Sequence, residues 1–308
     1  MNHNVMVAPV GIRTEALRNL HPPNNLNPYT PNQQEQFIEE AKISVQQAID
    51  RDIDLASSVE ALKIGDISYL HISSAVPADE ISFRHEFVLA GMAELFGKII
   101  GYKVEYQGNI FHHLVPDEEH ADEQSSLGYA NELSAHRDVE HIPDPGNPNY
   151  LCLLCRVPAP SAHTIIYPNE RIIEKLDEHT QNVLQTEFPF IPPATFGNGE
   201  LTMLPILTQE GYHSSIRWGN ILESALSDES TEAYMKLKSA IRQVRNESAQ
   251  IICLQTGDLL LFNNHRILHG RTRFKLDKNC RRHLIRCYVV SDFEGMRSRF
   301  HMHGRILV

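Results

Sequence analysis

A tight turn that leads into an apolar strand near the C-terminus constrains this chain most. Gly257 and Asp258 supply the turn, and Leu259–Phe262 is the apolar run that follows. A short apolar run bounded by turn residues is typical of a strand buried on both faces. The stretch continues to His269, which we expect at the end of this core strand. A histidine at the end of a buried strand is well placed to bind a metal ion.

Size and charge narrow the classes of function. The chain has 308 residues, enough for a large core, and we expect one domain over 1–308 with an N-terminal arm at 1–30 and a helical insertion or lid at 219–249. With 28 Lys and Arg against 39 Asp and Glu, the net charge is −11. This acidic balance argues against binding to nucleic acids. Local basic clusters at 266–275 and 281–286 suit a small anionic ligand.

The chain carries no pattern of an exported or membrane protein. Its first residues lack a basic segment followed by a long apolar stretch, so we expect no signal peptide. No apolar run approaches the length of about 20 residues that a membrane span needs. Five cysteines without framework spacing fit a reducing cytoplasm. We interpret Cys152 and Cys155 as buried thiols on opposite faces of one strand.

Hydrophobic periodicity predicts a mainly β protein with helices, of the α+β class. Thr30 as N-cap, Pro31 in the first turn and Gln33 reaching back predict the start of a helix, and a second helix is expected over 82–100 with Gly101 as its stop. Two more helices are expected over 170–187 and 228–247. The expected strands are 67–73, 103–115, 150–157, 163–167, 214–218, 251–255, 258–263 and 283–291. This order indicates a double-stranded β-helix, or jelly-roll, braced by helices.

A second stretch, His136-Arg137-Asp138, offers the partners that His269 needs for a metal site. Residues two apart on a strand share a face, so His136 and Asp138 can point at one atom. Two imidazoles and one carboxylate are the ligand set of non-haem iron(II) oxygenases, which leave coordination positions open. We therefore predict that His136, Asp138 and His269 bind a metal and act in catalysis.

Other residues could compete for this role. His120 and Asp122 have the same spacing, but they lie in a charge-dense run that is typical of a solvated loop. The alternatives for the distal ligand are His265, His283 and His301. His265 and His269 also have the i,i+4 spacing of a helical zinc site, although the apolar strand before them argues against a helix.

Two stretches resemble a known family. Residues 122–164, with Gly128, Glu132-Leu133 and His136-Arg137-Asp138, and residues 257–286, with the run Gly-Asp-Leu-Leu-Leu-Phe-Asn-Asn before His269-Gly270-Arg271-Thr272, are similar to the clavaminate synthase-like, taurine dioxygenase-related iron(II)/2-oxoglutarate oxygenases. The resemblance covers about a quarter of the chain and points to the amino-acid hydroxylase branch. It implies Fe(II), 2-oxoglutarate and O2 as cofactor and co-substrates.

The resemblance also implies roles for residues outside the ligand set. Thr164 stands at the position whose hydroxyl contacts the 2-oxoglutarate carboxylate. Arg282 matches the arginine that binds the distal carboxylate bidentately, with Arg281 as a second candidate because the interval from His269 is one residue short. Arg286, on the same strand face, is expected to reinforce that clamp or hold a substrate carboxylate.

Departures from the family concern mainly the substrate. Asp138 stands where most of this branch has Glu, and a carboxylate there favours hydroxylation over halogenation. The family's lid commonly has an Asp two residues after an Arg, where it pairs with a cationic substrate group; here Gly219 follows Arg217, and Glu223 is the nearest acid. A strongly basic substrate therefore loses its expected partner. The remaining candidate substrate contacts are Glu105, Gln107, Ser125, Ser126 and Trp218.

Together these features predict a dioxygenase that hydroxylates a free amino acid or a small amino-acid-derived metabolite and releases succinate and CO2. Desaturation or ring closure by the same chemistry, a non-catalytic cupin-like binding protein and a zinc hydrolase are the alternatives. We expect a cytoplasmic protein with a small-molecule substrate and no nucleic-acid or membrane partner. The sequence does not predict the oligomeric state.

Overall fold

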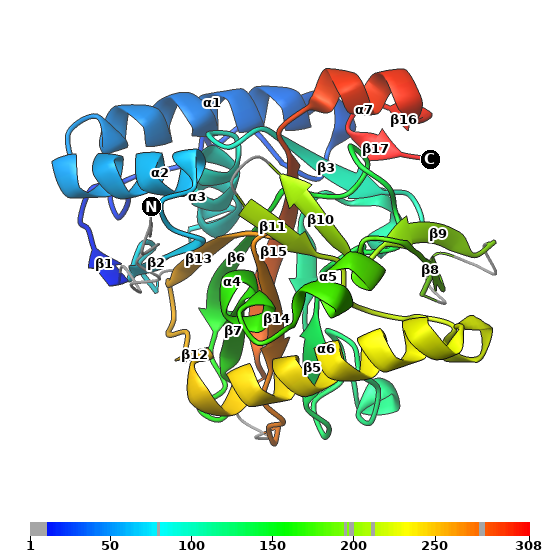
Figure 1. Cartoon of the computed structure of the whole chain (residues 1–308). Coiled ribbons are helices and arrows are strands. Elements are labelled where there is room, and N and C mark those ends of the chain that lie inside the picture. Colours follow the sequence, from blue (N-terminus) through cyan, green and yellow to red (C-terminus); the bar gives the residue numbers. More distant parts are fainter. Residues whose placement is uncertain (1–10, 79–80, 194–195, 197–199, 211–212, 277–280) are drawn as a thin grey trace.

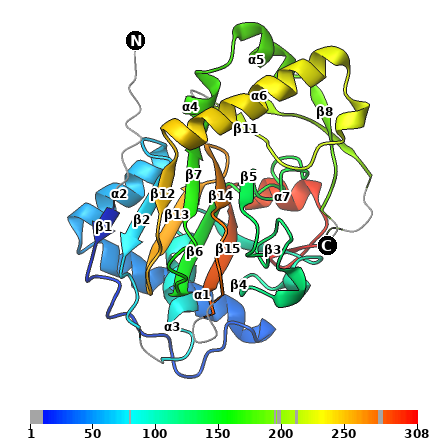
Figure 2. The same ribbon diagram turned by 90° about the horizontal axis from the view of Figure 1, so that it is seen from below.

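Two facing β-sheets form the centre of the protein (Figures 1 and 2). The structure is a computed structural model that describes residues 11–78, 81–193, 196, 200–210, 213–276 and 281–308. In order across it, the larger sheet comprises β1 (Gly11–Arg13), β2 (Tyr69–Ser73), β13 (Leu259–Asn263), β6 (Tyr150–Val157), β15 (His283–Val290), β3 (Lys98–Tyr102), β17 (Ile306–Leu307) and β16 (Met302–His303), with β4 (His112–Leu114) also paired to β15.

The smaller sheet carries the C-terminal histidine strand. Its order is β12 (Gln250–Ile252), β7 (Thr164–Pro168), β14 (Ile267–Arg271) and β5 (Leu133–His136). Inward side chains of both sheets, among them Ile166, Phe262 and Leu284, pack into one core. Two hairpins flank the sheets: β8 (Glu187–Phe190) with β9 (Thr202–Pro205), and β10 (Leu207–Glu210) with β11 (His213–Ile216). This arrangement confirms the predicted jelly-roll core.

Helices cover the outer faces of both sheets, as Figure 2 shows. On the larger sheet lie α1 (Pro31–Ile49), α2 (Ile53–Ile64) and α3 (Arg84–Ala93), packed on side chains such as Cys152 and Ile285. On the smaller sheet lie α4 (Asn169–Ile173), α5 (Glu178–Leu184) and α6 (Asp228–Glu247), packed on Ile165 and Leu268. The last helix is α7 (Phe293–Arg299). No helix of the described residues is both long and apolar enough to cross a bilayer.

Several predicted elements are confirmed. Helix α6 and strand β6 have the predicted bounds, and Cys152 and Cys155 are buried thiols in different core clusters on the two faces of β6. Of the predicted N-terminal arm, 1–10 lie outside the described residues. The single-domain division and the 219–249 lid stay predictions.

The prediction of one helix over 82–100 is wrong at its C-terminal end. Helix α3 ends at Ala93, and β3 begins at Lys98 and pairs with β15. The turn uses Gly97, where an added Cβ would lie 2.2 Å from the carbonyl oxygen of Val290. Sheet pairing therefore outweighs the helical periodicity of this stretch. Of the predicted strand 103–115, only β4 forms, because a 3-10 turn at Tyr106–Gly108 interrupts the segment.

Two local predictions about helix ends are also wrong. The stretch 170–187 forms two helices rather than one, because Asp177 accepts a hydrogen bond from the Thr180 backbone N–H (2.7 Å) and starts α5. Helix α1 begins as predicted at Pro31, but the Thr30 side chain makes no capping hydrogen bond. Gln33 accepts instead from the backbone N–H of Asn27 (2.9 Å).

The turn before β13 depends on Asp258. Its carboxylate accepts hydrogen bonds from the backbone N–H groups of Ser74 (2.8 Å) and Gln255 (2.9 Å) and lies 3.0 Å from His71 Nε2. Gly257 has φ +82°, and an added Cβ would lie 1.8 Å from the Val76 carbonyl oxygen. The turn therefore requires both glycine and a charged acceptor.

Replacing Asp258 with asparagine is expected to lower the free energy of unfolding by about 1–3 kcal/mol at pH 7. Burial by itself would raise the pKa of Asp258, but the hydrogen bonds from His71, Gln255 and Ser74 outweigh it and hold the pKa below its usual value. The stabilisation is therefore complete above the unfolded-state pKa of about 3.9 and is lost as the pH falls through the folded-state pKa. Urea unfolding at pH 7 and pH 3 measures this difference; a gap between wild type and variant that widens in acid would contradict it.

A candidate metal centre

His136, Asp138 and His269 meet at one edge of the smaller sheet. Strands β5 and β14 pair with His136 directly opposite His269. The Asp138 Oδ1 atom lies 3.1 Å from His136 Nε2 and 3.8 Å from His269 Nε2. One possible ligand atom from each side chain lies within 4.8 Å of the others, and among the described residues this is the only such group. The three side chains could hold one divalent metal ion.

The local structure around these residues differs from the prediction in two ways. Strand β5 ends at His136, so Asp138 lies in the following turn rather than on the strand, next to Val139 with φ 58°. His269 lies in the middle of a second strand, β14, rather than at the end of β13. The turn after Asn263 reverses the chain and carries His269 to the other sheet. The ligands therefore meet through sheet pairing, not through alternation along one strand.

The electrostatics of the group favour a cation. Burial would raise the pKa of Asp138, but the Arg286 charge and the hydrogen bond with His136 outweigh it and keep the carboxylate ionised. Burial and the nearby His136 lower the pKa of His269 to about 3, so its imidazole is neutral. His136 Nδ1 lies 2.9 Å from the Ser134 carbonyl oxygen. Burial by itself would lower the pKa of His136, but the hydrogen bond with Asp138 and the charge of that carboxylate outweigh it and raise the pKa. A metal ion would take the place of the proton on Nε2. A neutral imidazole and a carboxylate are what a metal ion requires.

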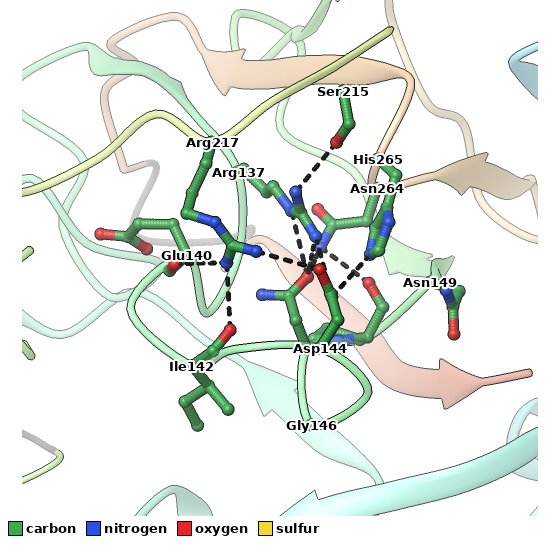
Figure 3. Close-up of polar contacts among 12 residues, drawn as sticks. Arg137, Glu140, Ile142, Asp144, Gly146, Asn149, Ser215, Arg217, Asn264 and His265 are labelled. Atoms are coloured by element: carbon green, nitrogen blue, oxygen red, sulfur yellow. Dashed lines mark hydrogen bonds and ion pairs between the residues drawn. The ribbon is translucent and has the colours of Figure 1, made fainter. Parts of the chain in front are cut away.

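The turn that carries Asp138 is held by buried amides and guanidinium groups (Figure 3). Arg137 donates to Asn147 Oδ1 (3.0 and 2.6 Å) and to Ser215 Oγ (3.0 Å). Arg217 donates to the carbonyl oxygens of Glu140 (2.6 Å) and Ile142 (3.0 Å). The turn is therefore tied to β11 and the segment after it.

Asn264 ties the same turn to the hairpin before β14. Its Oδ1 accepts from the Asp138 backbone N–H (3.2 Å), and its Nδ2 donates to the carbonyl oxygens of Asp138 (3.1 Å) and Pro148 (3.0 Å). Asn264 is completely buried. This residue belongs to the Asn-Asn pair of the sequence motif, and its position explains why an amide is needed there.

Replacing Asn264 with alanine is expected to lower iron(II) affinity about 10- to 100-fold, because partners that orient a ligand have effects of this size. Calorimetric titration of the anaerobic protein with Fe(II) measures the affinity. Asn131→Ala, which removes an exposed amide that donates to the Asp122 carbonyl oxygen (2.7 Å), is the matched control. Unchanged affinity in a folded Asn264→Ala variant would show that Asn264 does not position Asp138.

A cavity of about 1030 Å³ opens onto the three side chains. Thr164 and Arg282 line it. Thr164 lies on β7 opposite Arg271 on β14, and the guanidinium groups of Arg271 and Arg282 lie over the same Phe274 ring, 4.9 and 5.6 Å from its centre. One corner of the cavity therefore combines a hydroxyl with two buried guanidinium groups.

Arg281 and Arg282, the two candidates for binding the distal carboxylate of 2-oxoglutarate, differ in burial. Arg281 is exposed, whereas Arg282 is 6% exposed and lines the cavity. Burial and the charge of Arg271 lower the pKa of Arg282 to about 10. No carboxylate of the described chain contacts Arg282, so this corner can take an anionic ligand.

Arg286 lies closer to the metal-binding group than to this corner. Its Nη1 atom is 3.0 Å from Asp138 Oδ2, and its Nη2 atom is 3.5 Å from Glu105 Oε1 and 3.0 Å from His112 Nδ1. Arg286 therefore fixes the outer oxygen of Asp138. Among the described residues, no contact of Arg286 supports the alternative that Arg286 helps Arg282 to bind the 2-oxoglutarate carboxylate.

The candidate substrate residues divide into two groups. Glu105, Ser125, Ser126 and Trp218 line the cavity. Gln107 is exposed in the 3-10 turn with φ 59° and Glu223 is exposed beside Lys238 (3.6 Å), and neither lines the cavity. Substrate contacts by Gln107 and Glu223 stay predictions: a turn, rather than a strand, presents Gln107, and Glu223 pairs with Lys238 of α6.

The alternative ligands do not join the metal-binding group. Asp122 is exposed and His120 lies 3.1 Å from Asp117. His283 faces His113 (2.8 Å between ring nitrogens), and His301 is exposed. His265 is not helical with His269, since β14 begins at Ile267.

Two buried charged residues are among the cavity residues that sequence reasoning missed. Arg271 and Glu140 both line the cavity and are both buried. Glu140 follows Asp138 by two positions and Arg271 follows His269 by two, so the spacing relative to the ligands was the available signal.

The fold and the three side chains define the class of jelly-roll proteins with a two-histidine, one-carboxylate site. Residues 193–288 match the taurine catabolism dioxygenase TauD, TfdA family. The chain is 29% identical to an L-lysine 3-hydroxylase of Catenulispora acidiphila over 219 residues, which cover 67% of this chain and 58% of that protein. The chain thus spans somewhat more than half the length of this curated relative.

Solved structures share the fold over most of the chain. An asparagine oxygenase in complex with Fe(II), 2S,3S-3-hydroxyasparagine and succinate superposes with a TM-score of 0.75 and 20% identity over 88% of both chains. The non-heme iron oxygenase OrfP in complex with Fe and alpha-ketoglutaric acid gives 0.76 and 18% identity over 91% of this chain and 93% of its own. The resemblance drawn from the sequence motifs is confirmed.

Proposed function

We propose that this protein is an iron(II)/2-oxoglutarate-dependent dioxygenase that hydroxylates an unactivated C–H bond of a free amino acid or a small amino-acid-derived metabolite. The observation that carries the proposal is the joining, in one cavity, of His136, Asp138 and His269 with the corner made by Thr164 and Arg282. A dicarboxylate co-substrate has two ends, and this cavity offers a metal-binding group for one and a buried cation for the other.

The residues present fit Fe(II). The imidazoles of His136 and His269 and the ionised carboxylate of Asp138 would hold the ion and leave positions open. Iron bound there would supply oxidation by O2, coupled to decarboxylation of 2-oxoglutarate to succinate and CO2. The protein's own part is to orient: Arg286 holds Asp138, and Arg282 with Thr164 would fix the far carboxylate.

The relatives support an amino-acid substrate. They include a lysine 3-hydroxylase, an asparagine oxygenase, and OrfP solved with (3S)-hydroxy-L-Arg. A non-catalytic binding protein needs no Arg282 corner, and a zinc hydrolase needs no co-substrate. Desaturation and ring closure use the same residues and differ in the product. The small-molecule partner and the cytoplasmic location stay part of this proposal.

One experiment tests the function against its alternatives. Protein reconstituted anaerobically with Fe(II) and 2-oxoglutarate is mixed with each member of an amino-acid panel, O2 is admitted, and succinate and product masses are measured. We expect substrate-stimulated succinate with a product 16 Da heavier than the substrate. A product 2 Da lighter would indicate desaturation or ring closure. Turnover without O2, or no stimulated succinate with any compound, would refute the proposal.

A further inference from the structure

Glu140 places a buried carboxylate in the wall of the cavity. Its side chain lines the cavity, and the residue is only 6% exposed. Its Oε1 atom accepts a hydrogen bond from the Asn220 backbone N–H at 3.0 Å. No Lys, Arg or His of the described residues forms an ion pair with it. A buried carboxylate is costly unless a cation or several donors compensate it.

The cations near Glu140 already have other partners. Arg217 donates to the Glu140 carbonyl oxygen, not to its carboxylate, and its second nitrogen lies 3.1 Å from Asp144 Oδ2. In Figure 3 the Glu140 carboxylate points away from the guanidinium groups of Arg217 and Arg137. Arg286, across the cavity, pairs with Asp138 and Glu105. Neither the Arg217 nor the Arg286 guanidinium group therefore pairs with the Glu140 carboxylate, which is left for a ligand.

Gly219 explains how the carboxylate reaches this place. A Cβ added to Gly219 would lie 2.0 Å from Glu140 Oε1 and 2.2 Å from its Cδ. The backbone of Gly219 does not have a positive φ, so the conformation would accept other residues. The three atoms nearest to the added Cβ all belong to the Glu140 side chain, which therefore occupies space that a side chain at 219 needs. The absence of a side chain at Gly219 therefore makes room for the Glu140 carboxylate.

We propose that Glu140 is a specificity-determining residue that binds the cationic end of the substrate, an ammonium or a guanidinium group. The inference rests on the proposed function, because the bound cation would belong to the amino acid that is hydroxylated. The binding of that cation can be measured without the reaction. Trp218 and Tyr234 also line the cavity, with their rings stacked at 4.9 Å. Lys238 lies 5.7 Å from the centre of the Tyr234 ring and shows that this ring accepts a cation, and its own charge is paired with Glu223 (3.6 Å). An amino acid with a cationic side chain is the chemical class that this wall recognises.

Binding of matched ligand pairs tests the proposal directly. L-lysine and L-norleucine differ by the terminal ammonium, and L-arginine and L-citrulline differ by the guanidinium charge. Calorimetry is performed anaerobically on protein loaded with Fe(II) and 2-oxoglutarate. We expect the wild type to bind the cationic member of at least one pair about 10- to 100-fold more tightly than the neutral member, the range for a charge-assisted hydrogen bond. Equal binding, or preference for the neutral member in both pairs, would overturn the proposal.

Glu140→Gln keeps the shape of the side chain and removes its charge. We expect this variant to lose most of the cation preference and to keep its affinity for 2-oxoglutarate. Glu60→Gln, at an exposed acid of α2 that does not line the cavity, is the matched control and should change the preference less than about twofold. A Glu140→Gln variant that binds 2-oxoglutarate normally and retains the full preference would contradict the assignment.

A pair of reciprocal variants tests the geometry. Gly219→Asp alone should lose ligand binding, because its Cβ collides with Glu140. Combining Glu140→Ala with Gly219→Asp removes the collision and supplies a carboxylate from the other side, so the double variant should regain part of the cation preference that Glu140→Ala loses. No recovery in a folded double variant would mean that the two positions do not share one space.

These results are distinguishable from failure of the proposed function. If cationic ligands bind preferentially but O2 produces no stimulated succinate, the specificity assignment holds and the reaction is wrong. If neutral amino acids are hydroxylated as efficiently as cationic ones, the reaction holds and the role of Glu140 is wrong.

Discussion

Replacing His269 with alanine is expected to abolish iron(II) binding at this site and to lower kcat/KM at least about a thousandfold, since loss of the metal removes several kcal/mol of stabilisation in the reaction. His269 is a neutral, buried imidazole opposite His136, and the substitution leaves two ligand residues instead of three. Iron content after anaerobic reconstitution and desalting measures the binding, and succinate release measures the turnover.

His301→Ala is the control for this experiment, because His301 is exposed and was one of the alternative ligands in the sequence. It should bind iron and turn over as the wild type does. Stoichiometric iron in the His269→Ala protein, or loss of iron in the His301→Ala protein, would refute the ligand assignment.

Replacing Arg282 with alanine is expected to raise the KM for 2-oxoglutarate about 100-fold or more, while iron binding changes little. A buried bidentate contact between a guanidinium and a carboxylate is among the strongest hydrogen-bonded pairs, and a loss of about 3 kcal/mol corresponds to more than a hundredfold. Arg282 lies in the cavity wall without a carboxylate partner in the described chain, which is why it is expected to take this ligand. Initial rates at varied 2-oxoglutarate concentration provide the measurement.

Arg281→Ala provides a neighbouring control with the same change in charge. Arg281 is exposed, so its removal should alter the KM less than about threefold, as for a surface charge. If the large effect appeared in Arg281→Ala and not in Arg282→Ala, the inward direction assigned to Arg282 would be wrong.

Local patterns predicted the elements better than their ends. The strand at 150–157 and the helix at 228–247 were predicted with their observed bounds, because each has a long uninterrupted period and clear end signals. Residues 98–102 were assigned to a helix, although they pair with β15. That pairing joins segments far apart in the sequence, and no local pattern encodes it.

In the candidate site, too, local patterns identified residues, whereas contacts between distant segments set their positions. The sequence indicated His136, Asp138 and His269, but it placed Asp138 on a strand and His269 at a strand end. The turn at Asp138 depends on Asn264 and Arg217, which come from other parts of the chain. Glu140 was missed because its significance depends on the close approach of Gly219.

Residue types and their spacing already indicate the chemistry that this protein can support: apolar strands for a jelly-roll, two histidines and a carboxylate, and an arginine-rich strand near the C-terminus. Which of the 17 histidines meet, which arginine turns inward and which acid lines the cavity follow from the folded chain. Residue type and spacing are local properties, whereas burial and sheet register arise from contacts between distant segments. Gly219 lacks the acid that a cationic substrate would need; packing supplies one at Glu140.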